Sequence, residues 1–173
     1  EFVNAIKSDP QHIPSLYSLG IIYMKNEDSD DAASNFKAIL KIDPDNHDAH
    51  YNMGVLYYKD EKYDDAITEF KEALDKRNEN ADIYYNMGLA YFKKKLFEDA
   101  ISSFKNTLKT KNKHVDALHE LGNSYNSIGN HEKAISLFNK VLTLSPKNAT
   151  CYFHLGNAYR ADKKRNEAHS AYK

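Results

Sequence analysis

Apolar residues recur along the chain at two helical spacings that alternate with each other. One stripe follows the spacing i, i+3, i+4, i+7, as in Tyr84, Met87, Gly88 and Tyr91. The other follows i, i+4, i+7, i+8, as in Ala66, Phe70, Ala73 and Leu74. Both spacings place side chains on one face of an α-helix, whereas a strand would show strict alternation. The pattern therefore predicts an all-α protein built from pairs of helices joined by short turns.

The pairs repeat at a constant interval. Five of the six glycines are 34 residues apart: Gly20, Gly54, Gly88, Gly122 and Gly156. A tyrosine follows each of them three residues later: Tyr23, Tyr57, Tyr91, Tyr125 and Tyr159. Twelve residues after the glycines come Ala32, Ala66, Ala100, Ala134 and Ala168, and sixteen after them come Phe36, Phe70, Phe104, Phe138 and Tyr172. The pattern breaks at Pro44, Asn78, Asn112 and Pro146. Such a period predicts a stacked array of helix pairs.

Close packing of the two helices in a pair accounts for the recurrence of small and aromatic residues. Glycine inside a helix costs roughly 0.5–1 kcal/mol relative to alanine. It is therefore expected where two helix axes come closest, with an aromatic ring beside it. A single helix pair cannot bury both of its apolar stripes, so neighbouring pairs must stack on one another.

These residues resemble the tetratricopeptide-repeat pattern along the whole chain. The pattern consists of a large residue, Leu-Gly or Met-Gly, Tyr, and then Ala, Phe and Pro, as in Leu16, Leu19-Gly20, Tyr23, Ala32, Phe36 and Pro44. The sequence departs from it with Leu, His or Tyr where the family often has Trp, and with Asn for Pro at two breaks. The resemblance implies an α-α superhelix, a right-handed solenoid of antiparallel helix pairs, whose concave side is lined by the first helix of each pair.

The same resemblance implies one solenoid over residues 1–173. Complete repeats are expected at residues 13–46, 47–80, 81–114 and 115–148, and a partial fifth repeat at 149–173. Residues 1–12, with Phe2, Ala5 and Pro10, match the end of a preceding second helix. We therefore expect apolar side chains to be exposed at both ends, with end-to-end self-association as a consequence.

Composition narrows the classes of function. Charged residues make up 28% of the chain and balance to a formal net charge of −1, which argues against a uniform nucleic-acid-binding surface. No apolar run approaches the ~20 residues that cross a bilayer. Cys151 is the only cysteine, which leaves no intramolecular disulfide and no cysteine-based zinc cluster. We expect a cytoplasmic protein without nucleic-acid or membrane partners.

The sequence offers no set of residues for catalysis. The repeat uses five of the six glycines, and the sixth, Gly129, lies in a turn between helices, so no glycine-rich loop is left to bind phosphate. His119-Glu120 and His131-Glu132 both lack the second histidine of a zinc-binding His-Glu-x-x-His motif. We predict that the chain is not an enzyme and holds no cofactor and no metal.

The resemblance places the candidate binding residues on the first helices, in a second stripe beside the core stripe. By repeat, that stripe reads Tyr17, Ile21 and Met24; Tyr51, Val55 and Tyr58; Tyr85, Leu89 and Phe92; His119, Asn123 and Asn126; and Phe153, Asn157 and Arg160. Asn52 and Asn86 follow the tyrosines and resemble the asparagine ladder of O-linked N-acetylglucosamine transferase. Burying each aromatic side chain in a partner would contribute on the order of 1.5–3 kcal/mol. Alternatively, these residues serve only to pack neighbouring first helices together.

The pattern therefore predicts a scaffold or adaptor that binds an extended peptide or a partner helix in its concave groove. Two alternatives stay open at this point. The chain could be the substrate-recognition arm of a larger enzyme, such as a glycosyltransferase of the O-linked N-acetylglucosamine transferase type. It could also be a purely structural solenoid within a multiprotein complex.

Overall fold

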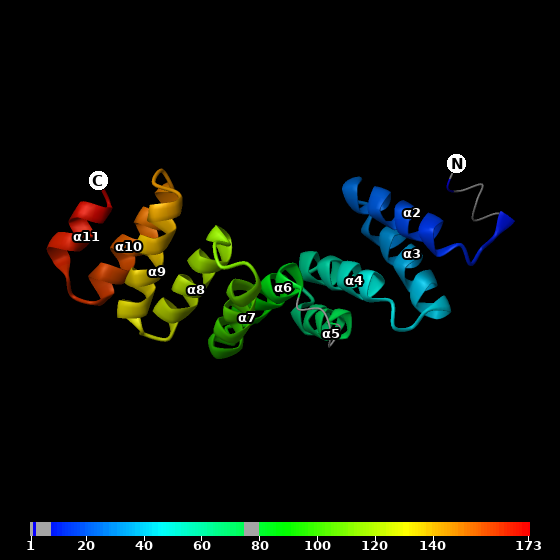
Figure 1. Cartoon of the computed structure of the whole chain (residues 1–173), viewed down its shortest axis with the longest axis horizontal. Coiled ribbons are helices and arrows are strands. Elements are labelled where there is room, and N and C mark those ends of the chain that lie inside the picture. The colour runs from blue at the N-terminus through cyan, green and yellow to red at the C-terminus, as the bar shows by residue number, and fades with distance from the viewer. Residues whose placement is uncertain (1, 3–7, 75–79) are drawn as a thin grey trace. The chain divides into compact units, whose positions relative to one another are not determined.

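The computed structural model describes residues 2, 8–74 and 80–173, which contain ten α-helices and no strand (Figure 1). The chain divides into two compact units, which we call the N-terminal unit (residues 1–79) and the C-terminal unit (residues 80–173). Each unit is described by itself. The all-α fold of antiparallel helix pairs predicted from the sequence is confirmed in both.

The N-terminal unit contains two helix pairs. Their helices are α2 (Ile13–Lys25), α3 (Ser29–Ile42), α4 (His47–Lys59) and α5 (Tyr63–Ala73). Helix α3 also packs against α4 and so joins the two pairs. The expected break at Asn78 and Ala5 of the expected preceding helix lie outside the described residues.

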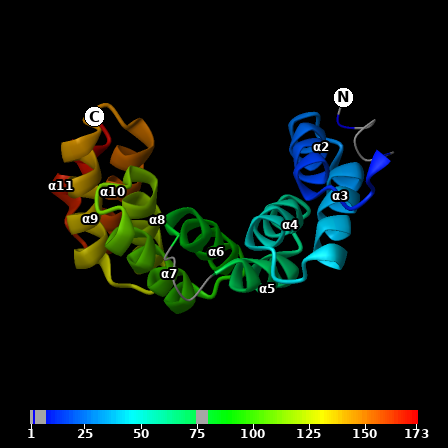
Figure 2. The ribbon, with the colours of Figure 1, turned by 45° about the vertical axis from the view of Figure 1, so that its right-hand side comes forward.

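The C-terminal unit contains three consecutive helix pairs, whose helices are also labelled in Figure 2. Their helices are α6 (Ala81–Lys93), α7 (Phe97–Thr110), α8 (Val115–Ser127), α9 (His131–Leu144), α10 (Ala149–Ala161) and α11 (Arg165–Ala171). The second helix of one pair packs against the first helix of the next, α7 on α8 and α9 on α10.

A side chain caps the start of most first helices. Asn46, His114 and Asn148 each accept a hydrogen bond from the backbone N–H three residues on, at 3.0, 3.2 and 2.9 Å. Asn80 accepts one from the N–H of Asp82 at 2.9 Å. Such caps stabilise a helix by about 1 kcal/mol each. The Asn residues before the first helices therefore have a local structural role.

The turn inside each helix pair is closed by a repeated hydrogen bond to the tyrosine of the repeat. In the second pair, the backbone N–H of Lys62 donates to the carbonyl of Tyr57 at 2.9 Å. This bond requires a left-handed residue just before it. That residue has φ between 60° and 79° in all five turns: Glu27, Glu61, Lys95, Gly129 and Lys163. Only one of the five is the glycine that usually occupies this position.

Glycine and phenylalanine form the centre of each pair, as the spacing predicted. The rings of Phe36, Phe70, Phe104 and Phe138 are fully buried. A Cβ atom added to Gly54 would lie 2.6 Å from the ring of Phe70, and the corresponding glycines show the same contact. The prediction that glycine marks the closest approach of the two helices is confirmed.

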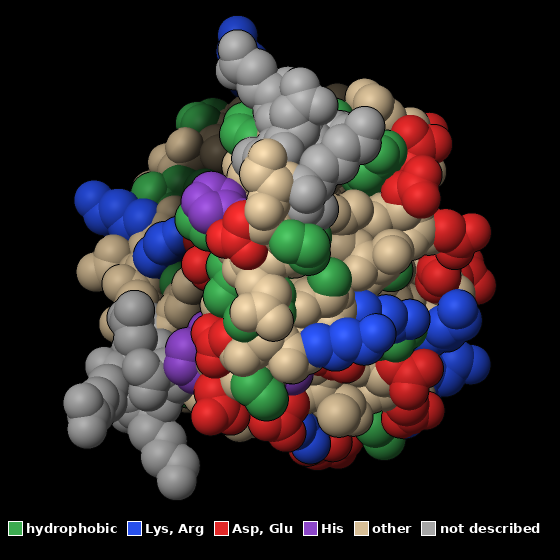
Figure 3. Space-filling view, turned by 90° about the vertical axis from the view of Figure 1, so that its right-hand side faces the viewer, with side chains coloured by type: hydrophobic (Ala, Val, Ile, Leu, Met, Phe, Trp, Pro, Cys, Tyr) green, Lys and Arg blue, Asp and Glu red, His purple; other side chains and the backbone are tan. Residues whose placement is uncertain are grey.

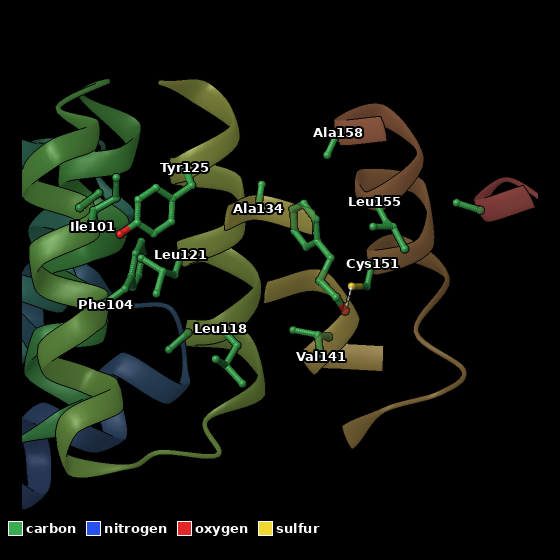
Figure 4. Packing of buried hydrophobic residues seen from close by; sticks show 14 residues of the cluster. Ile101, Phe104, Leu118, Leu121, Tyr125, Ala134, Val141, Cys151, Leu155 and Ala158 are labelled. Carbon is green, nitrogen blue, oxygen red and sulfur yellow. Dashed lines mark hydrogen bonds between the residues drawn. The ribbon is translucent and has the colours of Figure 1, made fainter. Parts of the chain in front are cut away.

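The core of the C-terminal unit continues from one pair to the next (Figure 4). Leu118 and Leu121 of α8 belong to the same buried cluster as Phe104 of α7. Cys151 of α10 is completely buried, and its Sγ lies 3.4 Å from the carbonyl oxygen of Phe138. Burial raises the pKa of the Cys151 thiol to about 11. Cys151 is therefore a packed small residue at the junction between two helix pairs.

His50 occupies the position where the family often has tryptophan. Its Nδ1 donates to Glu69 Oε2 at 2.7 Å and its Nε2 to the carbonyl of Pro44 at 2.9 Å. Burial favours the neutral imidazole, but these two acceptors outweigh it and raise the pKa of His50. Because both ring nitrogens face acceptors, the bonding favours the imidazolium form.

The C-terminal helix pair exposes the surface that the other pairs bury. Tyr172 is 45% exposed, although the four phenylalanines at its repeat position are fully buried. Phe153 is 56% exposed, and with Tyr152 and Tyr172 it lines a hollow of about 550 Å³. The expectation of exposed apolar side chains is confirmed at this end.

Candidate functional site

The predicted binding residues of the N-terminal unit lie on α2 and α4. We call the stripe formed by Tyr17, Ile21, Met24, Tyr51, Val55 and Tyr58 the N-terminal first-helix face; all six side chains are half-buried. The Tyr17 ring meets the buried ring of Phe36 edge-on, with centroids 6.1 Å apart. Tyr51 lies at the same distance from Phe70. The inner part of each tyrosine is thus fixed by the core of its own pair, while its outer part reaches the surface.

The second aromatic position of α4 is supported from the following helix. Tyr58 packs edge-on against Tyr63 of α5, with ring centroids 5.5 Å apart. The equivalent pair in the C-terminal unit, Phe92 and Phe97, has the same arrangement at 5.4 Å. Sequence reasoning missed Tyr63 and Phe97, although the 34-residue register relates them to each other.

Asn52 lies beneath the N-terminal first-helix face. It is only 5% exposed. Its Nδ2 donates to the backbone carbonyl of Asp48 at 2.7 Å and lies 3.5 Å from the hydroxyl of Tyr17. Asn86, at the equivalent position of α6, is half-buried. The two asparagines therefore differ in how far they can reach a ligand.

In the C-terminal unit, the aromatic part of the stripe lies on α6. Tyr85 packs against Phe104 at 5.9 Å between ring centroids. On its other side it stacks on the imidazole of His114, at 4.8 Å and an interplanar angle of 30°. Leu89 and Phe92 continue the stripe and are half-buried. Tyr85 is held between two rings, which restricts its rotation.

On α8 and α10 a polar network replaces the aromatic stripe. His119 Nδ1 donates to Glu120 Oε1 and Asn123 Nδ2 donates to Glu120 Oε2, both at 3.2 Å. His154 Nδ1 donates to Asn123 Oδ1, and the rings of His119 and His154 lie 4.9 Å apart. These bonds link two neighbouring first helices through side chains.

The network fixes the charge of its members. Burial opposes the ionisation of Glu120, but the hydrogen bonds from His119 and Asn123 outweigh it and lower the pKa of Glu120. Burial and the neighbouring imidazole of His119 lower the pKa of His154. At neutral pH this part of the surface therefore carries one carboxylate next to a neutral His154.

The remaining predicted residues lie at the edges of these helices. Asn126 Oδ1 accepts a hydrogen bond from His131 Nδ1 at 2.7 Å. Asn157 Oδ1 accepts one from the hydroxyl of Tyr172 at 2.8 Å. Arg160 is exposed. We call Tyr85, Asn86, Leu89, Phe92, His119, Asn123, Asn126, Phe153, Asn157 and Arg160 the C-terminal first-helix face.

Glu120 and His154 were not among the predicted site residues. The signal was present, because the 34-residue register aligns both with Asn52 and Asn86. A register shows which positions share a face, but it does not show that two imidazoles and an amide meet around a carboxylate. In the described part of the chain, no group of three or more His, Cys, Asp or Glu side chains could hold a metal ion. Among the same residues, no helix is long and apolar enough to span a bilayer.

Comparison with known families agrees with the geometry. The TPR repeat model matches residues 56–95 and 122–162, and two tetratricopeptide-repeat models match residues 23–69 and 81–114. The chain belongs to the tetratricopeptide-repeat family. No curated protein matches this tetratricopeptide-repeat chain.

Solved structures share the fold of this tetratricopeptide-repeat protein over most of its length. MamA is 28% identical, with a TM-score of 0.87, and the match covers 92% of this chain and 87% of MamA. YrrB, described as a TPR protein with an unusual peptide-binding site, is 21% identical with a TM-score of 0.88, covering 98% and 88%. PilW, a type IV pilus biogenesis factor, is 21% identical with a TM-score of 0.84, covering 98% and 79%. At these identities YrrB and PilW show the fold alone.

Proposed function

We propose that this tetratricopeptide-repeat protein is an interaction scaffold that binds an extended peptide or a helix of a partner protein on its first-helix faces. The observation that carries the proposal is the support beneath the half-buried tyrosine side chains. Tyr17, Tyr51 and Tyr85 each rest on a buried phenylalanine, so a ligand would meet rings that are already fixed in place. Preorganised anchors of this kind lose little conformational entropy on binding.

On the C-terminal first-helix face, polar groups lie in the same unit as Tyr85. The Asn123 amide has a second N–H besides the one it donates to Glu120, and the oxygens of the Glu120 carboxylate can accept further hydrogen bonds, so both could bond a peptide backbone. Asn52 supports Tyr17 from below in this proposal, because it is 5% exposed and already donates to Asp48.

The test uses a peptide selected from a displayed library on the full chain. Leu89→Glu places a charge on the C-terminal first-helix face without removing a ring from the core. Ser102→Glu, on an exposed position of α7, makes a matched control. We expect Leu89→Glu or Val55→Glu to weaken binding about tenfold to a hundredfold, as loss of one buried apolar anchor implies.

Fluorescence anisotropy with the labelled peptide measures the effect, and circular dichroism shows that each variant is folded. Ser102→Glu should bind like the unaltered chain. If selected peptides bind both face variants and the control with equal affinity, the first-helix faces are not the binding surface and the proposal is wrong.

A further inference from the structure

The two units carry opposite net charges. Residues 1–79 contain 17 Asp and Glu against nine Lys and Arg, a formal charge of −8. Residues 80–173 contain eight Asp and Glu against 15 Lys and Arg, a formal charge of +7. The near-neutral total therefore hides a strong asymmetry. An asymmetry of this size between the parts of a chain points to charged partners.

Part of this difference in net charge comes from positions beside the first helices. At equivalent positions of the repeat, the sign of the charge is reversed between the two units. In the turn before α4 and directly after it, the N-terminal unit has four carboxylates at positions where one repeat of the C-terminal unit, before α8 or after α6, has a lysine. The equivalent pairs are Asp43 and Lys111, Asp45 and Lys113, Asp60 and Lys94, and Glu61 and Lys95. The two residues compared each time occupy the same position in the repeat. The backbone therefore does not dictate the sign of the charge.

Carboxylates lie at both ends of α4, one of the two helices that carry the N-terminal first-helix face. Asp48 is in the first turn of α4, and Asp60 and Glu61 follow its last residue. At 1.5 Å of rise per residue, Val55 lies roughly 9–11 Å along the helix from Asp48 and from Glu61. That is slightly more than one Debye length at physiological salt. A cation bound over Val55 would thus be attracted from both ends.

Local basic residues neutralise only part of this charge. Lys62 pairs with Asp60 at 3.2 Å, and both side chains are about half exposed. Exposed pairs of this kind contribute little and exchange readily with other partners. Figure 3 shows Asp and Glu side chains on several parts of the visible surface, with Lys side chains between some of them. The surroundings of the N-terminal first-helix face therefore remain acidic.

We propose that the N-terminal first-helix face binds a cationic segment of a partner protein. Aliphatic and aromatic side chains of that segment would contact Tyr17, Tyr51 and Val55. Its Lys or Arg side chains would lie over the tyrosine rings and reach the carboxylates at the two ends of α4. Tyrosine faces attract ammonium and guanidinium groups, and the long stems of these side chains also cover apolar surface. This inference rests on the proposed function and adds the chemistry of the ligand to it.

Three synthetic peptides test the proposal on the full chain. They share one amphipathic pattern of leucine and tyrosine and carry Lys, Glu or Gln at every polar position. Anisotropy is measured with each labelled peptide at low and at physiological salt. We expect the Lys peptide to bind at least about tenfold more tightly than the Glu peptide, with the difference shrinking as salt screens it.

Reversing the charge at selected residues shows which unit attracts the Lys peptide. The variant Asp60→Lys/Glu61→Lys copies the residues that the C-terminal unit has at these positions. Lys95 adopts the same left-handed conformation as Glu61, so the exchange is compatible with the backbone. It should weaken binding of the Lys peptide about three- to tenfold. The matched control, Lys94→Asp/Lys95→Glu, should leave that affinity unchanged or raise it.

The outcomes separate this inference from the proposed function. The variant Val55→Gln removes the apolar contact at the face without adding a carboxylate that would itself attract the Lys peptide. If the three peptides bind equally and Val55→Gln weakens them all, binding at the face stands and the cationic ligand is wrong. If the control reversal weakens the Lys peptide as much as Asp60→Lys/Glu61→Lys does, the charge preference does not come from the N-terminal unit and the inference fails. If Val55→Gln changes the binding of none of the peptides, the face is not a docking surface for them and both are wrong.

Discussion

Replacing Gly88 by alanine would measure how tightly glycine and phenylalanine interlock. The added Cβ would lie 2.6, 2.8 and 2.9 Å from Cε1, Cδ1 and Cζ of Phe104. Phe104 is completely buried, and Tyr85 packs on it with ring centroids 5.9 Å apart. The ring therefore has no space into which it can withdraw. Overpacking of this kind costs about 1–3 kcal/mol, and the better helix propensity of alanine returns up to about 1 kcal/mol.

We therefore expect Gly88→Ala to lower the free energy of unfolding by about 1–2 kcal/mol. Urea unfolding followed by circular dichroism measures it as a lower midpoint. The double variant Gly88→Ala/Phe104→Leu should lose less than the sum of the two single variants, since the smaller side chain makes room for the added methyl group. If the two losses simply add, or if Gly88→Ala is as stable as the unaltered chain, the interlocking explanation is wrong.

Gly156→Ala places the same methyl group against a ring that can move. Its Cβ would touch Tyr172, which is 45% exposed and is held by a hydrogen bond to Asn157. Rotation of Tyr172 towards solvent relieves the contact at the cost of that exposed bond, about 0.5–1 kcal/mol. The gain in helix propensity offsets this cost, so the net change should be near zero. Amide hydrogen exchange in α10 is the appropriate measurement, because it reports the local opening of one helix pair without global unfolding.

Four further predictions concern particular residues. In the left-handed turns, Lys95→Gly should raise the free energy of unfolding by about 0.5–1 kcal/mol and Gly129→Ala should lower it by about 1–2 kcal/mol, as read from urea midpoints. The raised pKa of His50 contributes stability that is fully present below pH 6.5 and is lost as the pH rises through the folded-state pKa. His50→Gln should therefore cost more at pH 5.5 than at pH 8. The lowered pKa of His154 has the opposite effect, because its contribution is present above pH 6.5 and is lost as the pH falls through the folded-state pKa. His154→Gln should accordingly cost more at pH 8, and equal costs at both pH values for either variant would contradict the hydrogen bonding described here. Finally, Cys151, whose thiol pKa is about 11, should resist alkylation by iodoacetamide at pH 8 until the chain is unfolded, and rapid labelling of the folded protein would show that the α9–α10 junction opens.

The helices and their core could be predicted because a close contact between two helices restricts residue size at fixed positions. Gly54 can only be glycine while the Phe70 ring lies 2.6 Å from where a Cβ would be. Such contacts recur whenever the pair recurs, so the 34-residue interval shows them in the sequence. The exposure of a residue cannot be predicted in this way. Phe138 and Tyr172 share one position, yet Phe138 is fully buried, with the ring of His154 of α10 edge-on against it, and Tyr172 is 45% exposed.

The candidate site could be predicted only as a stripe. The register placed Tyr17, Tyr51 and Tyr85 on one face, and the structure adds that each rests on the phenylalanine of its own pair. Whether a polar side chain is buried or can reach a ligand depends on the hydrogen bonds that its neighbours donate and accept. Asn52 is buried and donates a hydrogen bond to the carbonyl of Asp48. Glu120, at an equivalent position, accepts a hydrogen bond from His119. No spacing rule contains that information.

The left-handed turn residues connect stability with the proposed ligand. Glycine is the residue best suited to this conformation, and Gly129 shows that the chain can use it there. Glu61 and Lys95 instead retain charged side chains at a cost of about 1 kcal/mol each. Both positions adjoin a first-helix face, and their charges are opposite in the two units. If Glu61→Gly stabilises the chain while weakening the Lys peptide, the carboxylate is kept for binding at the expense of stability. If Glu61→Gly leaves both quantities unchanged, the charge at this turn has no such role.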